Sequence, residues 1–195
     1  FQYLILIFIG SFFHSSALMA LVLVLFRTTN INAKVWASVF FACLIIHLTH
    51  FDILKVIDFI PFEYYQFKLK GYIYLQNKDN IHLNYFNVVY LLQNAIIIIC
   101  FYYKEQIQKE EKNLNLFLNM CCLSSCSYLF FGQIPGFAVR ISEVFNCSLI
   151  ILIPLIVKAI KPKHIAEALV LAIGWGIFLI NILHSKLVLD YKTLW

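Results

Sequence analysis

The chain has 195 residues, of which 62% are hydrophobic and 13% are charged, and its mean hydropathy is +0.83. Soluble domains are about 45–50% apolar and roughly 25% charged, so this composition excludes a disordered chain, a nucleic-acid-binding domain and an ordinary cytosolic enzyme. The net charge of +5 is better explained by membrane orientation and anionic headgroups than by nucleic acid. The sequence predicts an all-α membrane protein: one domain, residues 1–195, formed by a polytopic bundle of about six transmembrane helices.

The expected helices follow from apolar stretches of about twenty residues, the length that a helix needs to cross the hydrocarbon core. They are expected at 4–26, 35–51, 85–103, 114–134, 141–160 and 165–185, with one longer polar segment at 52–84. We expect the Pro135-Gly136 pair to close the fourth helix. The chain opens at Phe1 without an initiator methionine or a signal peptide, and we expect it to be a fragment of a longer protein.

The distribution of lysine and arginine over alternate loops predicts an orientation. Three short loops hold Arg27, Lys34, Lys104, Lys109, Lys112, Lys158, Lys161 and Lys163. The other loops hold Lys55, Lys68, Lys70, Lys78, Arg140, Lys186 and Lys192, spread over a greater length. Because cytoplasmic loops carry the denser positive charge, the first set is expected to be cytoplasmic. The segment 52–84, the turn with Arg140 and the C-terminal tail are then expected outside.

Two ionisable residues stand out as candidates for chemistry. His14 lies inside the first apolar stretch, where an ionisable group is costly and usually faces a bundle interior or a cavity. A neutral histidine that packs against a neighbouring helix explains the same pattern. Arg140 follows an uncharged stretch and offers a planar fork of donors for a phosphate or a carboxylate. The alternative is a snorkelling arginine that pairs with Glu143.

The remaining candidates are weaker. Aromatic and basic residues are interleaved in the segment from Phe59 to Tyr74, which contains Lys70 and Tyr72. This pattern suits sugar stacking and headgroup contact, and it suits an aromatic belt at the membrane surface equally well. The six cysteines all lie in apolar stretches and are expected to pack helices rather than to bind a metal.

Two stretches together resemble the EpsG family, which groups with the Wzy-type O-antigen and capsular polysaccharide polymerases. The first is Phe13-His14-Ser15-Ser16-Ala17-Leu18. The second is Gly132-Gln133-Ile134-Pro135-Gly136-Phe137-Ala138-Val139-Arg140-Ile141-Ser142-Glu143-Val144-Phe145, followed by Ile151-Leu152-Ile153-Pro154. Lys70-Gly71-Tyr72 and Asp190-Tyr191-Lys192 are similar to shorter motifs of the family, although Asp190 stands where a proline is often seen. The resemblance covers nearly the whole chain.

The resemblance implies a multi-pass enzyme of the bacterial plasma (inner) membrane. Its reaction would be a glycosyltransferase-type polymerisation on the outer face, joining undecaprenyl-diphosphate-linked repeat units of O-antigen, capsule or exopolysaccharide. Arg140 would hold the leaving diphosphate, and His14 would orient or deprotonate the acceptor. Lys70, Tyr72 and Glu143 would contact the glycan or a phosphate.

The expected partners are the lipid-linked oligosaccharide, membrane lipids and a polysaccharide chain-length regulator. No cofactor, metal or nucleic acid is expected. Two other functions fit the same sequence. A non-enzymatic flippase or transporter of lipid-linked oligosaccharides would use intramembrane His14 and Pro154 along a translocation path. A membrane acyltransferase would use His14 as its base.

Overall fold

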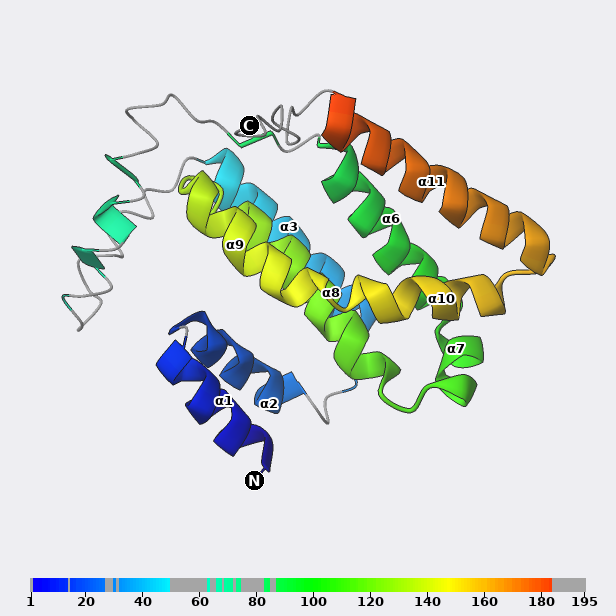
Figure 1. Ribbon diagram of the computed structural model, residues 1–195, viewed down its shortest axis with the longest axis horizontal. Helices are drawn as coiled ribbons and strands as arrows, with labels where there is room; N and C mark the ends of the chain where they lie inside the picture. The colour runs from blue at the N-terminus through cyan, green and yellow to red at the C-terminus, as the bar shows by residue number, and fades with distance from the viewer. Residues whose placement is uncertain are drawn as a thin grey trace, which may run out of the picture.

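The computed structural model describes most of the chain as helices. The described residues are 2–13, 15–26, 30, 32–49, 63, 66–67, 69–71, 73–74, 83–84 and 87–183. Over these residues every regular element is helical, as the sequence predicts. Figure 1 shows the helices gathered around one central element, α8.

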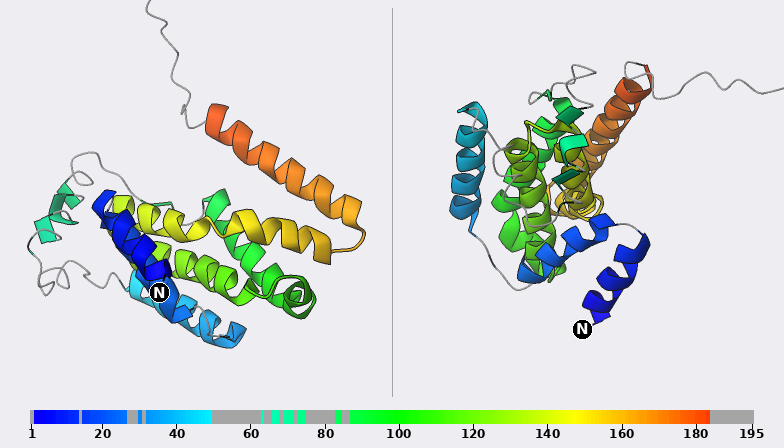
Figure 2. Two further views of the ribbon diagram at one scale, coloured as in Figure 1. Left: turned by 60° about the horizontal axis from the view of Figure 1, so that its bottom comes forward. Right: turned by 90° about the vertical axis from the view of Figure 1, so that its left-hand side faces the viewer.

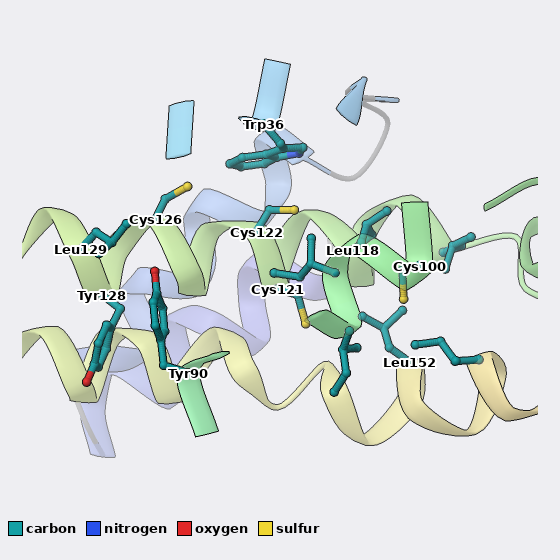
Figure 3. Close-up of a cluster of buried hydrophobic side chains, with 14 of the residues drawn as sticks. Trp36, Tyr90, Cys100, Leu118, Cys121, Cys122, Cys126, Tyr128, Leu129 and Leu152 are labelled. Carbon is teal, nitrogen blue, oxygen red and sulfur yellow. The ribbon is translucent and has the colours of Figure 1, made fainter. Parts of the chain in front are cut away.

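Helix α8 (Leu114–Phe130) can occupy the centre because it carries no charged side chain and has serine and cysteine among its larger apolar residues. Twelve of its 17 residues are buried, and α3, α6, α9 and α10 all pack on it. Serine and cysteine side chains allow the backbones of neighbouring helices to approach closely. Figure 3 shows Cys122 and Cys126 on the side of α8 that faces Trp36, with Cys121 directed towards Leu152 of α10. Five of the six cysteines are buried, and only Cys147 is exposed.

Helices α3 (Ala33–Leu48) and α6 (Val88–Tyr102) lie along α8. Each begins at an asparagine N-cap, because the side chains of Asn32 and Asn87 accept a hydrogen bond from a backbone N–H two residues on. The bounds of both helices lie within three residues of the expected ones.

Hydrogen bonds fix how these two helices run relative to α8. The indole N–H of Trp36 on α3 donates to Asn119 Oδ1 of α8 at 3.1 Å. From α6, the Tyr90 hydroxyl donates to the Ser125 carbonyl at 3.1 Å, and its ring stacks on that of Tyr128 at 4.5 Å. Such bonds between helices compensate for polar groups that no water reaches.

The first predicted helix, 4–26, is wrong as a continuous element. The chain instead forms α1 (Gln2–Phe13), a 3₁₀ helix η1 (Ser15–Leu21) and α2 (Val22–Phe26), and α1 packs against η1. The Tyr3 hydroxyl donates to the Ala20 carbonyl at 2.8 Å, so the chain has reversed direction between them. Gly10 permits this reversal, because a Cβ there would lie 3.3 Å from the Cβ of Ala17. Hydropathy alone does not report such a reversal.

The turn after α8 also differs from the expectation. Helix α8 ends at Phe130, four residues before the expected end, and α9 (Pro135–Asn146) begins at Pro135 itself. Proline is favoured at the first position of a helix, because its missing N–H has no partner there in any case. The Pro135-Gly136 pair therefore opens a helix rather than closing one. Arg140 accordingly lies within α9 and not in a turn.

The expected helix at 141–160 is in fact two elements. Helix α9 is followed by α10 (Leu149–Ala159), and the two are bent by 51° at a short break. Helix α7 (Lys104–Glu110) follows α6 at 81°. Taken singly, no helix in the described part of the chain is both long and apolar enough to cross a membrane, whereas these two bent pairs are, by length and composition.

The loops with the denser positive charge meet at one end of the bundle. Lys104 donates to Asn30 Oδ1 at 2.7 Å, and Lys158 lies 3.9 Å from Glu110, so the α2–α3, α7–α8 and α10–α11 connections are neighbours. At the opposite end, Tyr128 bonds the Asn84 carbonyl before α6. Helix α11 (Lys163–Leu183) packs on α10 and lies across the bundle from α3 (Figure 2). Among the described residues, those next to the densely basic connections therefore lie together, at the end opposite Asn84.

Candidate functional site

Helix α9 has one buried face and one exposed face. Ala138, Ile141, Ser142 and Phe145 are buried against the bundle at helical spacing. On the other face, Gly136, Arg140, Glu143 and Cys147 are all exposed. The positions 136, 140 and 143 recur every three to four residues, so their side chains share one stripe of the helix. The two charged candidates of this region, Arg140 and Glu143, thus lie one turn apart on the same exposed face.

The position of this face is set by the packing of α9 on α8. Ala138 is fully buried, so that the two backbones approach closely. The hydroxyl of Ser124, on α8, donates to the carbonyl of Ser142 at 2.7 Å, and both residues are buried. At the far end of α9, the Cys121 and Ser148 side chains lie 3.1 Å apart. These contacts hold α9 in a fixed rotation, and this rotation directs Arg140 away from α8.

A third candidate, Lys70, belongs to a segment that packs at the start of α9. Ile134, which precedes α9, is buried, and Leu69 and Ile73 pack against it with Phe137. Leu69 and Ile73 are four residues apart in backbone of helical conformation, so both side chains point to the same side. Lys70 itself is exposed beside this contact.

The structure thus brings the segment with Lys70 and the exposed face of α9 to the same end of the molecule. Two other candidates, His14 and Tyr72, lie outside the described residues. Helix α1 ends at Phe13, the residue before His14, and η1 begins at Ser15, the residue after it.

A buried polar cluster between α6 and α8 was not predicted from the sequence. Ser125 donates to Asn94 Oδ1 at 2.6 Å, and Asn94 Nδ2 donates to the Tyr90 carbonyl at 2.8 Å. Gln93, also on α6, donates to the Cys121 carbonyl at 3.2 Å. The signal was present, because an adjacent Gln-Asn pair in an otherwise apolar helix needs partners from a neighbour. This cluster fixes α6 on α8, and its hydrogen bonds are made within the protein.

The exposed face of α9 has a definite chemical capability. A guanidinium offers five N–H donors in a fixed plane and can bind two oxygens of a phosphate at once. A carboxylate one turn away accepts hydrogen bonds and can hold a sugar hydroxyl or orient the guanidinium. Arg140 and Glu143 therefore combine an anion-binding group with a hydroxyl-binding group on one helix face.

Comparison with known proteins gives one match. The sequence model of the EpsG family matches residues 1–193, which is nearly the whole chain. No curated protein and no solved structure matches the chain significantly.

Proposed function

The chain belongs to the EpsG family, and from that premise we propose that it polymerises a polysaccharide by joining undecaprenyl-diphosphate-linked repeat units on the outer face of the bacterial plasma membrane. The family is associated with polysaccharide biosynthesis and with glycosyltransferase-like polymerase activity on a lipid-linked substrate. The observation that carries the proposal is the family match over residues 1–193, since it includes the segments that contain His14, Lys70 and Arg140.

The surface of the bundle supports a membrane location. Large apolar side chains are exposed on α1, α6, α10 and α11, and among them are Leu6, Phe12, Ile98, Ile150, Leu171 and Trp175. The interior meanwhile contains buried Gln93, Asn119, Ser124 and Ser125. Exposed apolar surface of this extent is costly in water and favourable in a hydrocarbon solvent. The polar interior provides the hydrogen bonds that hold helices together where the hydrophobic effect does not.

The reaction needs two kinds of help from the protein. Negative charge accumulates on the leaving diphosphate and must be stabilised by a fixed positive group, and the acceptor hydroxyl must be positioned and lose its proton. In this proposal Arg140 holds the diphosphate, because its guanidinium matches two phosphate oxygens. His14 orients or deprotonates the acceptor hydroxyl. Glu143, Lys70 and Tyr72 contact the glycan or a phosphate, and a chain-length regulator is a candidate partner.

Substitution of Arg140 tests the proposal directly. In cells that carry the full-length gene, Arg140→Ala is expected to abolish long polymer, with the protein still inserted in the membrane. Loss of one transition-state donor typically costs about 10²–10³ in rate. The measurement is the length distribution of the polysaccharide on a gel. Lys109→Ala is the matched control, since Lys109 is an exposed cation at the other end of the bundle. A normal length distribution with Arg140→Ala would exclude the assigned role.

The same strains separate the proposed polymerase from a flippase. A polymerase that has lost activity leaves single repeat units at the cell surface, whereas an inactive flippase leaves them on the cytoplasmic side. Surface labelling of intact cells with an antibody or lectin against the repeat unit distinguishes these outcomes. Repeat units that are absent from the surface of the Arg140→Ala strain would favour the flippase.

A further inference from the structure

A half-open groove lies between α3 and α6, and α8 forms its floor. Trp36, Phe40 and Phe41 line it from α3, and Ile97, Ile98 and Phe101 line it from α6. Its volume is about 360 Å³, which falls within the roughly 300–1,000 Å³ of small-molecule sites. Both helices pack on α8, and the groove occupies the space between them. It lies away from α9 and therefore away from the candidate catalytic face.

The polar groups in this groove are already engaged with each other. Asn94 and Ser125 line its inner end, and the Ser125 hydroxyl donates to Asn94 Oδ1 at 2.6 Å. Asn94 Nδ2 donates in turn to the Tyr90 carbonyl at 2.8 Å. A ligand therefore gains little from hydrogen bonding inside the groove. The remaining walls are aromatic and aliphatic, which favours a hydrocarbon.

The shape of the groove suits a single chain. Along α3 it extends from Ala33 to Phe41, a distance of about 12 Å at the helical rise of 1.5 Å per residue. Ile98 and Phe41 are exposed at its open side. In a bilayer this side faces the lipids, so that a hydrocarbon chain can enter sideways from the membrane.

One end of the groove carries a positive charge. Lys104 follows α6, and its ammonium nitrogen lies 5.9 Å from the ring centre of Phe101, within the range of a cation–π contact. The same nitrogen donates to Asn30 Oδ1 at 2.7 Å, three residues before the groove residue Ala33. Within the described part of the chain, no carboxylate lies within 4.0 Å of Lys104.

Lys104 is also incompletely solvated. Partial burial lowers its pKa from the ordinary value, and the nearby thiol of Cys122, another groove residue, acts in the opposite direction. An anion at this position would complete the charge balance of a cation that has lost part of its hydration.

We propose that this groove binds one hydrocarbon chain of an anionic phospholipid, whose phosphate lies against Lys104 at the end of the groove. The apolar walls hold the chain, and the ammonium group of Lys104 and the amide N–H₂ group of Asn30 donate to the phosphate oxygens. A diacyl lipid fits better than a long polyprenyl chain, because about 12 Å of groove covers only a short stretch of hydrocarbon. The inference depends on the membrane location in the proposed function, and it does not depend on polymerase activity.

Fluorescence of Trp36 tests the proposal, since this residue lines the groove. Trp175→Phe and Trp195→Phe leave Trp36 as the single tryptophan. The protein is reconstituted in vesicles of phosphatidylcholine and phosphatidylglycerol. In each sample one of the two lipids carries bromine on its acyl chains, and the brominated lipid is present at the same small mole fraction. Brominated phosphatidylglycerol is expected to quench Trp36 more strongly than brominated phosphatidylcholine. Equal quenching by the two lipids, or no quenching by either, would overturn the proposal.

Two pairs of variants assign the preference to the groove. Lys104→Gln is expected to lower the preference for phosphatidylglycerol roughly fivefold, whereas Lys109→Gln, on the same helix α7, is expected to leave this preference unchanged. Ala37→Phe fills the groove and is expected to remove the excess quenching, whereas Ala172→Phe on α11 retains it. Circular dichroism verifies that each variant keeps its helices. If a variant loses its helices, the comparison of the two lipids in the single-tryptophan protein decides the matter alone.

A last arm of the experiment distinguishes the source of the phosphate. Unbrominated polyprenyl phosphate is added to the same vesicles and compared with an equal amount of unbrominated phosphatidylglycerol. Weaker relief of quenching by polyprenyl phosphate supports a bilayer phospholipid as the occupant. Equal or stronger relief by polyprenyl phosphate would overturn that assignment. Neither result alters the polymer lengths by which the proposed function is tested.

Discussion

At the scale of single residues, glycine has opposite roles at two positions. A Cβ at Gly10 would lie 3.3 Å from the Cβ of Ala17, where α1 meets η1, whereas a Cβ at Gly174 in α11 would have no neighbour within 4 Å. Gly174→Ala is expected to stabilise the protein by about 0.5–1 kcal/mol, because alanine is the better helix former. Gly10→Ala gains the same helix propensity, but the crowded contact with Ala17 offsets this gain in stability.

Thermal unfolding in detergent measures this difference. The midpoint is expected to rise for Gly174→Ala and to stay level or fall for Gly10→Ala. Gly10→Leu is expected to lower it further, because the larger side chain cannot fit between α1 and η1. An equal rise for both alanine variants would contradict the close packing at Gly10.

The candidate residues show how far single positions can be read from a sequence. Arg140 stands out because it ends a long uncharged stretch, and this signal needs no knowledge of the fold. Its place on the exposed face of α9 follows instead from the burial of Ala138 and Ser142. This burial cannot be predicted from any single residue. The polar pair Gln93-Asn94 was missed because their partners, Cys121 and Ser125, are about thirty residues away in the chain.

At the scale of elements, the rotation of α9 depends on its contact with α8. Ser124 is fully buried, and its hydroxyl donates to the Ser142 carbonyl at 2.7 Å. Ser124→Ala removes one hydrogen bond between helices, which is worth about 0.6–1.7 kcal/mol in a membrane protein. Ser124→Leu also adds volume to a packed interface, which costs about 1–3 kcal/mol. Both variants are expected to lower the midpoint of thermal unfolding, and leucine more than alanine.

Ser38→Leu on α3 provides the matched control for this pair. Ser38 is exposed, so the same change in side chain is expected to alter the stability by less than about 0.5 kcal/mol. A Ser124→Leu protein as stable as the Ser38→Leu protein would show that the α8–α9 interface is loosely packed.

Elements were predicted well where one apolar run makes one helix. The bounds of α3, α6 and α11 lie within a few residues of the expected ones, because polar residues mark both ends of each run. The run 4–26 and the run 141–160 each contain a break that hydropathy does not record. In the first, Gly10 allows α1 and η1 to approach closely, and the Ser11 hydroxyl donates to the Phe8 carbonyl at 2.7 Å. Both breaks depend on backbone geometry, which amino-acid composition does not record.

At the scale of the whole molecule, the structure divides the loops between two ends. One end contains Lys104, Lys109 and Lys158, and the other contains Lys70 and the start of α9. The sequence predicts this division from the alternation of apolar stretches, even though the first stretch folds back on itself. Which end faces the cytoplasm is a separate question, and its answer depends on the density of positive charge.

Single-cysteine labelling tests that orientation. Cys147→Ala removes the exposed cysteine, and the other five are buried. Lys70→Cys and Lys109→Cys then place one accessible thiol at each end of the bundle, since both positions are exposed. With a membrane-impermeant maleimide on intact spheroplasts, Lys70→Cys is expected to be labelled, whereas Lys109→Cys should react only after the membrane is permeabilised. This follows because the denser positive charge around Lys109 is retained on the cytoplasmic side. The reverse pattern would put the exposed face of α9 at the cytoplasmic end, and polymerisation by Arg140 on the outer face would then be excluded.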